Sequence, residues 1–496
     1  MFFYGRKMTT AVTLRSQSGR WILVATILGS GVAFLDGSVV NVALPTIGRD
    51  IGGGLSVLQW VLDAYLLTLS ALLLLGGALG DRYGRRRVYT IGLVLFTLAS
   101  LGCGLAPNGA ALIIARLLQG IGGALLVPGS LALINSSIRH DDRGEAVGRW
   151  AGMTGVSSAI GPFVGGWLVD TASWRWVFFI NVPIAAAALL ALRHVPETRN
   201  PTAGGRLDIF GAISVTIGLA GAVYALIEVP TKGWDGLTAV AAVVGVAALV
   251  AFPLIEMRHP EPLLPLSLFR SAQFTGANLT TFAVYAALSG ALFLLSLQLQ
   301  QSMGYPALAA GIATLPITII MLLMSGRVGA LAQRTGPRVL MTIGPVICAG
   351  GLTLLTWAVP GSTYLNGVLP GVLVFGIGLS ITVAPLTSAV LASVSPDNGG
   401  LASGVNNAVS RLAGLFAVAV LPVATGLSHT GAGAPLGPGF GQAMLISAAM
   451  CAAGGVLAWL TIDRTRKVTT YPLPGLNHAC QDPCTCAVER GQGTTS

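Results

Sequence analysis

The chain has 496 residues, of which 53% are hydrophobic and only 9% are charged, and it carries a formal net charge of +10. Soluble domains contain about a quarter charged residues, so this composition excludes a soluble globular protein. The apolar runs are continuous rather than alternating, which excludes a β-barrel and predicts an all-α polytopic membrane protein. The basic residues lie at the ends of these runs, which indicates orientation in a membrane rather than binding to nucleic acid.

Fourteen apolar runs follow one another along the chain, each about 20 residues long and able to cross a bilayer as a helix. An even number of spans places both termini on one side. The loops of that side carry most of the arginines, so both termini are predicted to be cytoplasmic. The expected spans are 21–44, 57–79, 88–106, 110–134, 147–169, 175–193, 208–228, 237–256, 275–300, 308–331, 338–358, 366–391, 402–426 and 442–462.

The chain contains an internal repeat. The charged loop between the second and third spans reads GALGDRYGRR at 77–86, and a weaker copy, GALAQRTGPR, follows at 329–338. Parallel halves of this kind are a recurring transporter architecture. The repeat therefore predicts two pseudo-symmetric six-helix bundles with an inserted two-helix hairpin between them. The expected divisions are 1–20 (cytoplasmic segment), 21–193 (first bundle), 194–274 (linker with spans seven and eight), 275–462 (second bundle) and 463–496 (disordered cytoplasmic tail).

The loop at 77–86 is predicted to act as a conformational latch. Its aspartate can pair with an arginine, or with the positive end of a neighbouring helix, in one conformation only. A loop that only sets orientation would need the arginines but not the glycines and the aspartate. Gln333 replaces the aspartate in the second copy, so the latch is expected to be weaker there. The latch residues are Gly77, Asp81, Arg82, Gly84, Arg85 and Arg86.

Three ionisable residues fall at similar depth within the spans of the first half: Asp36, Asp63 and Arg116. Ionisable groups inside a membrane are costly and indicate function. A buried carboxylate beside a movable arginine changes its protonation as the pair forms and breaks, which is what proton coupling requires. The alternative is a fixed ion pair that ties helices together. Asp63 lies close enough to the surface to be wetted, and Glu228, at a span end, is expected to be solvated.

The fifth span has a face rich in glycine and proline. Proline breaks the helical hydrogen-bond ladder, and the glycines leave a groove in which a neighbouring helix can approach closely. This face is interpreted as a hinge between the halves, with tight packing as the alternative. It comprises Gly152, Gly161, Pro162, Gly165 and Gly166.

Polar side chains follow the ninth span at near-helical spacing, with no acidic residue among them. A polar stripe on a membrane helix must face protein or a water-filled cavity. We expect the first half to handle protons and the second half to form a partly apolar substrate wall, although each polar side chain could equally hold helices together. The expected wall residues are Asn278, Thr281, Phe282, Tyr285, Ser289, Phe293, Asn406, Asn407 and Arg411, with Gln119 of the fourth span.

No metal site and no cofactor are predicted. Cys480, Cys484 and Cys486 lie beside His478 in the polar tail, where their spacing could chelate a metal, but nothing else there completes a site. The other histidines lie in loops without partner groups, which argues against a membrane enzyme. No Gly-x-x-x-x-Gly-Lys-Ser/Thr loop occurs, which argues against a pump driven by ATP.

Five motifs carry a resemblance that covers about residues 20–465. The loop at 77–86 resembles the signature of the major facilitator superfamily. The others resemble motifs of its fourteen-helix bacterial drug:proton antiporters: LDGSVVNVALP at 35–45, RLLQG at 116–120, GPFVGG at 161–166 and WRWVFFINVP at 174–183. The resemblance implies a major facilitator fold in a bacterial cytoplasmic membrane, coupling through Asp36 and proton transfer at Arg116.

The expected function is therefore proton-coupled antiport that exports amphipathic molecules, often cationic or antibiotic. The partners are the small-molecule substrate, protons and the lipid bilayer, and the protein is expected to be monomeric. Two alternatives stay open: an exporter dedicated to one metabolite or siderophore, and an uncoupled facilitator that tolerates neutralisation of Asp36.

Overall fold

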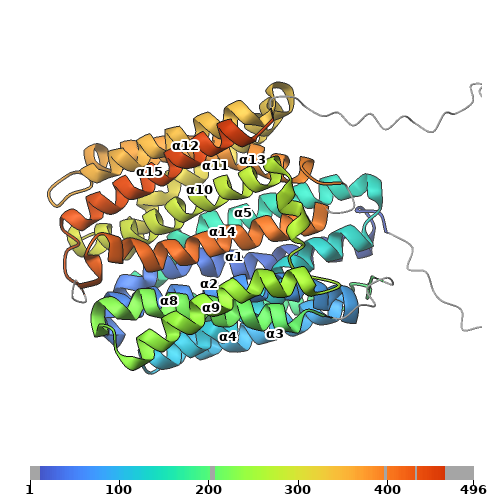
Figure 1. Cartoon of the computed structure of the whole chain (residues 1–496), viewed down its shortest axis with the longest axis horizontal. Helices are drawn as coiled ribbons and strands as arrows, with labels where there is room; N and C mark the ends of the chain where they lie inside the picture. The colour runs from blue at the N-terminus through green and yellow to red at the C-terminus, as the bar shows by residue number, and fades with distance from the viewer. Residues whose placement is uncertain (1–11, 201–206, 396–398, 430–432, 464–496) are drawn as a thin grey trace, which may run out of the picture.

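The computed structural model describes residues 12–200, 207–395, 399–429 and 433–463, and the described part is a single bundle of helices (Figure 1). The first half runs from α1 to α7 and the second half from α10 to α15, with the hairpin of α8 and α9 between them. The helices of the first half are α1 (Gln17–Ile51), α2 (Gly54–Tyr83), α3 (Arg85–Gly104), α4 (Gly109–Ser137), α5 (His140–Thr171), α6 (Trp176–Phe179) and α7 (Asn181–Leu192).

The hairpin consists of α8 (Ile209–Lys232) and α9 (Gly236–Arg258). A short 3-10 helix at Leu266–Arg270 then leads into the second half. The main helices of that half are α10 (Ala272–Leu297), α11 (Ala307–Thr335), α12 (Pro337–Leu354), α13 (Leu369–Ala392), α14 (Gly399–Ala424) and α15 (Pro438–Thr461).

Twelve helices of the described residues are long and apolar enough to cross a membrane. The other two expected spans correspond to α5 and to the pair α6 and α7. α5 has 32 residues, but it begins with a charged turn and is rich in glycine. The pair α6 and α7 gives only a short apolar segment, Trp176–Leu192. The protein is thus a multi-pass membrane protein, and the count of fourteen spans remains a prediction.

The expected loop between the second and third spans is much shorter than the sequence suggested. α2 continues to Tyr83 and α3 begins at Arg85, so Gly84 alone separates them, with φ of 112°. Only glycine adopts this backbone conformation readily. We call this end of the bundle, where α2 passes into α3, the basic end, and the opposite end the far end. α1 begins and α15 ends at the basic end, on the right in Figure 1.

The inserted hairpin bridges the two halves through one of its helices. α8 packs against both α2 and α14 in an apolar cluster that includes Leu67, Val223 and Leu415. The sequence suggested that Glu228 is solvated, and this expectation is wrong. Glu228 is buried, accepts a hydrogen bond from Trp60 Nε1 at 2.8 Å, and pairs with Lys232 at 3.1 Å. Few side chains of α9 are buried, and it leaves a long apolar face for lipid.

The two halves meet tightly at the far end. Gln59 on α2 donates to the carbonyl of Val418 on α14 at 2.7 Å. Asp170, at the end of α5, accepts from the backbone N–H groups of Ala307 and Leu308 at 3.1 and 2.8 Å, and so caps α11. One hydrophobic core runs across this end from α1 and α2 to α10 and α13. The far end is therefore closed.

At the basic end, α5 and α11 separate. Gly148, Gly152 and Gly155 continue the face of α5 that meets α11 farther along, yet a Cβ added at any of them would touch nothing within 4 Å. The same is true of Gly326 on α11. Among the described residues, every side-chain hydrogen bond between the halves lies toward the far end. The conformation is thus closed at the far end and open between α5 and α11 at the basic end.

Gly166→Val is expected to stop the far end from closing. An added Cβ would lie 2.6 Å from the carbonyl oxygen of Ala307 and would also overlap the backbone of Leu308, so α5 and α11 could not approach. A maleimide should then label a cysteine placed at Ser296 faster than in protein with Gly166 intact, because Ser296 bonds to the carbonyl of Asn41 across the closed far end and is 6% exposed. Gly152→Val is the matched control, since its Cβ meets no atom. Equal labelling in all three proteins would refute the role of Gly166.

Candidate functional site

Asp36 is the centre of a buried polar network in the first half. It lies on α1 and is 0% exposed. Its Oδ2 accepts from Arg116 Nη1 at 2.5 Å, and its Oδ1 accepts from Gln119 Nε2 at 2.8 Å and from Asn181 Nδ2 at 3.1 Å. Three donors, from α4 and α7, thus hold one carboxylate.

Arg116 is held on several sides. Its Nε donates to the carbonyl of Val61 at 2.9 Å, and its Nη1 also donates to Gln119 Oε1 at 2.8 Å. The guanidinium carbon lies 4.4 Å from the ring centre of Tyr65, which is close enough for a cation–π interaction. Its Nη2 is buried without a hydrogen-bond partner among the described residues. Arg116 therefore keeps one unused donor inside the protein.

Asn181 and Ser100 were not predicted as site residues. Asn181 Nδ2 donates both to Asp36 and to Ser100 Oγ, the latter at 3.0 Å, while Ser100 donates to the carbonyl of Phe178 at 2.9 Å. Both side chains are 0% exposed. Asn181 begins α7 inside the motif at 174–183, so a polar residue opening an apolar helix was the available signal. Its contact with Asp36 depends on how α1, α3 and α7 pack.

Asp63 lies apart from this network. Both of its carboxylate oxygens are buried without a hydrogen-bond partner among the described residues. The sequence suggested that Asp63 is wetted, but its side chain is 0% exposed. Its face of α2 points toward α14: one turn before it Gln59 bonds to Val418, and one turn after it Leu66 lies 3.7 Å from a Cβ built on Gly414. Asp63 thus lies at the interface between the halves.

The polar residues predicted for the substrate wall divide into two groups. Asn406 Nδ2 donates to Asn278 Oδ1 at 3.2 Å and to Thr281 Oγ1 at 2.7 Å, which joins α14 to α10. Asn278 and Thr281 are buried, so these three residues hold helices together in this conformation. Phe293 is 0% exposed and packs in the core, so it does not line a substrate cavity in this conformation. The group that stays partly exposed comprises Phe282, Tyr285, Ser289, Asn407 and Arg411.

The latch residues lie at the junction of α2 and α3. Asp81 on α2 pairs with Arg85 on α3, four residues later, at 2.7 Å, so this pair lies within the first half and not across the halves. The N-terminus of α3 is capped by Glu197, which accepts from the N–H groups of Arg86 and Arg87 at 3.0 Å each. A carboxylate is favourable at this positive helix end. Glu197 was missed because it lies more than a hundred residues away.

The glycines of α5 serve two different contacts. Gly161 and Gly165 lie against α1, where an added Cβ would overlap Ser38 and would lie 3.1 Å from Val39 Cγ1. Gly166 faces α11, as does the backbone of Pro162. Gly152, in contrast, meets nothing within 4 Å. The predicted face is therefore a packing surface toward the far end and is unoccupied toward the basic end.

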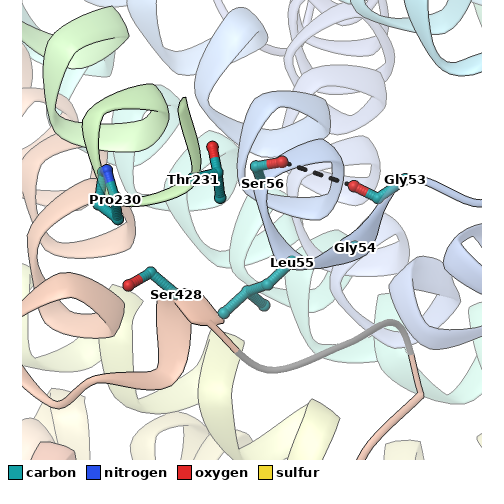
Figure 2. A pocket seen from close by; sticks show the side chains of 7 residues that line it. All are labelled: Gly53, Gly54, Leu55, Ser56, Pro230, Thr231 and Ser428. Atoms are coloured by element: carbon teal, nitrogen blue, oxygen red, sulfur yellow. Dashed lines mark hydrogen bonds between the residues drawn. The ribbon is translucent and has the colours of Figure 1, made fainter. Parts of the chain in front are cut away.

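A shallow pocket lies at the far end, between the start of α2, the end of α8 and the segment after α14 (Figure 2). Its lining contains none of the residues predicted for the site. The lining residues are Gly53, Gly54, Leu55, Ser56, Pro230, Thr231 and Ser428.

Within the described residues, no group of three or more His, Cys, Asp or Glu side chains is placed to hold a metal ion. Cys103, Cys348 and Cys451 are buried free cysteines, as expected for core residues. The tail cysteines Cys480, Cys484 and Cys486 lie outside the described residues.

The chain is similar to transporters that confer resistance to drugs. It is 35% identical to the puromycin resistance protein pur8 of Streptomyces alboniger, covering 89% of this chain and 91% of that protein. It is 36% identical to the methylenomycin A resistance protein of Bacillus subtilis, covering 90% and 95%. It is also 36% identical to the multidrug resistance protein Stp of Mycobacterium tuberculosis, covering 80% and 74%.

Solved structures show the same fold. The D-xylose-proton symporter superposes with a TM-score of 0.64 at 17% identity, covering 91% of this chain and 99% of that chain. An inward-facing bacterial homologue of the human lysosomal transporter Spinster gives a TM-score of 0.62 at 15% identity, covering 89% and 96%. The family model of the Major Facilitator Superfamily matches residues 26–418. The chain is therefore a membrane transporter that belongs to the Major Facilitator Superfamily, among relatives that confer resistance to antibiotics and multiple drugs.

Proposed function

We propose that this transporter exports amphipathic drugs or antibiotics across the bacterial cytoplasmic membrane in exchange for protons. The single observation that carries the proposal is the fully buried Asp36–Arg116 pair, with Gln119 and Asn181 on the same carboxylate. Burying a charge pair this deeply in a membrane protein costs free energy, so such a pair indicates a functional role. Relatives named for puromycin, methylenomycin and multidrug resistance support the substrate class.

The proton step follows from the contacts of Asp36. In the conformation open at the basic end, the ionised carboxylate accepts three hydrogen bonds and pairs with Arg116. When Asp36 gains a proton, it loses its charge and one of its acceptor positions, so the pair with Arg116 weakens. Arg116 then turns its free Nη2 to another acceptor, and the packing of α1 against α4 changes. The carrier thereby alternates between two conformations according to the charge on Asp36.

Asp63 supplies a second protonatable group. A carboxylate without hydrogen bonds is strongly disfavoured inside a protein, so Asp63 holds a proton in this conformation. In antiport the proton enters from the far end, so Asp63 takes up its proton when α2 and α14 separate there and water reaches it. In this proposal Asp36 is ionised and Asp63 is neutral in the same conformation.

The basic end faces the cytoplasm in this proposal, because the arginines of its loops follow the positive-inside rule. The conformation is then inward-open, with residues 21–193 and 275–462 as the moving bundles and 194–274 as the connecting hairpin. The latch at Asp81 and Arg85 would engage the second half when the basic end closes. The protein acts as a monomer within the bilayer.

Transport in liposomes tests this function. Purified protein is reconstituted, a pH gradient is imposed, and accumulation of a panel of cationic, neutral and anionic drugs and dyes is followed with and without a protonophore. Accumulation that requires the gradient and covers several molecules is expected. Equal rates with and without the gradient would indicate an uncoupled facilitator. Transport of a single molecule from a wide panel would indicate a dedicated exporter.

A further inference from the structure

Arg411 is a cation between the two halves without a counter-ion. It lies on α14 near mid-height, and its Nε is buried without a hydrogen-bond partner. Within the described part of the chain, no carboxylate pairs with its guanidinium, whereas Arg116 is bonded on several sides. An unpaired charge in a membrane domain is expensive, so a residue of this kind is retained for a ligand or a pathway.

The surroundings of Arg411 are aromatic and come from both halves. Its guanidinium carbon lies 5.4 Å from the ring centre of Phe34 on α1. Tyr65 on α2 and Tyr285 on α10 lie within range of an electrostatic interaction with its guanidinium. Asn407 lies one turn earlier on the same face of α14. The arginine, the aromatic rings and the amide thus surround one place where the halves face each other.

The acidic groups of the first half do not neutralise Arg411. Asp36 is engaged by Arg116, Gln119 and Asn181. Asp63 accepts no hydrogen bond at all among the described residues, from Arg411 or from any other donor. The positive charge of Arg411 is therefore available to a molecule that enters from the open basic end.

We infer that this place binds the acidic group of the substrate, so the transported molecules carry a carboxylate or phenolate on an aromatic body. The planar guanidinium fork matches a carboxylate with two parallel hydrogen bonds. Phe34 and Tyr285 supply flat apolar surfaces for the aromatic part, and Asn407 supplies further hydrogen bonds. This inference rests on the proposed export function and differs from the expectation of substrates that are often cationic, because Arg411 would repel a cation.

A pair of dyes with one ring system tests this preference. Fluorescein carries a carboxylate and an ionised phenol, whereas rhodamine 123 has a related tricyclic ring with a net positive charge. Binding to the purified protein is measured by quenching of tryptophan fluorescence, and transport is measured in liposomes with a pH gradient. The variants are Arg411→Gln, Arg411→Lys and, as a matched control, Arg258→Gln, which removes an exposed charge from the end of α9.

Native protein should bind fluorescein more tightly than rhodamine 123. Arg411→Gln should weaken fluorescein binding by about tenfold or more, with rhodamine 123 binding unchanged or tighter. Arg411→Lys should keep part of the preference, because it keeps the charge but loses the fork. Arg258→Gln should resemble native protein. Thermal melts confirm that each variant is folded.

An unchanged ratio of the two affinities in Arg411→Gln would overturn the inference, as would native protein that prefers rhodamine 123 or binds neither dye. Failure of the export function has a different signature: dye binding that depends on Arg411, without gradient-driven movement of either dye. The binding and transport measurements therefore separate the two claims.

Discussion

Asp36→Asn is expected to reduce gradient-driven transport to the level of empty liposomes, while the variant still folds and binds substrate. The asparagine keeps the shape of the side chain and one oxygen that can accept from Arg116, but it cannot gain or lose a proton. The network of Arg116, Gln119 and Asn181 would therefore stay in one arrangement irrespective of pH. Uptake of dye under an imposed pH gradient, with binding measured separately, checks this expectation.

Asp141→Asn is the matched control for Asp36→Asn. Asp141 lies near the start of α5 at the basic end, where its side chain is 98% exposed, so the same chemical change should leave transport unaffected. If Asp36→Asn transports as fast as native protein and still responds to the gradient, Asp36 is not the coupling group. A variant that transports equally with and without a gradient would show that Asp36 couples transport but does not drive the conformational change.

Arg116→Gln is expected to destabilise the protein strongly. It leaves the carboxylate of Asp36 buried without its cation, and loss of one partner of a buried pair typically costs about 3–5 kcal/mol. The variant should therefore show a lower melting temperature and a lower yield. The double variant Asp36→Asn/Arg116→Gln should recover much of the lost stability, because no unpaired charge remains, yet it should not couple transport to protons.

Arg85→Gln provides the comparison for this second prediction. Its pair with Asp81 is partly exposed, with 18% and 38% of the two side chains accessible, and such pairs contribute about 0–1 kcal/mol. Its melting temperature should change little. If the double variant is as unstable as the sum of its single changes, Asp36 and Arg116 do not act as a pair, and the fixed contacts of Arg116 with Val61 and Tyr65 account for its burial.

The helical architecture followed from the sequence because membrane insertion imposes simple rules. Continuous apolar runs identified the helices, and the repeated loop at 77–86 and 329–338 identified the two halves. The weakest predictions concern α5, whose glycines and charged first turn lower its hydropathy, and the pair α6 and α7, whose apolar segment is short. The loop between α2 and α3 was overestimated because an apolar run ends before its helix does: Gly80 to Tyr83 is polar and still helical.

The site could be predicted only in part, because sequence position gives depth but not direction. The sequence placed Asp36, Asp63 and Arg116 within apolar runs, and the structure buries all three in helices, yet only Asp36 and Arg116 meet. Asp63 points to α14 instead, which follows from the rotation of α2. Likewise, the polar stripe of α10 did not show whether its members face a cavity or another helix; Asn278 turned out to bind Asn406.

The most direct test of proton coupling through Asp36 measures protons rather than substrate. Purified protein in weakly buffered detergent solution at a pH near neutrality is mixed with a transported drug, and a pH indicator reports protons released per molecule of protein. Drug binding shifts the population from the conformation with protonated Asp36 to the conformation in which Asp36 is ionised, so native protein should release protons on binding, and Asp36→Asn should release fewer at the same occupancy. Equal release by the two proteins, or none by native protein that binds the drug, would contradict coupling through Asp36.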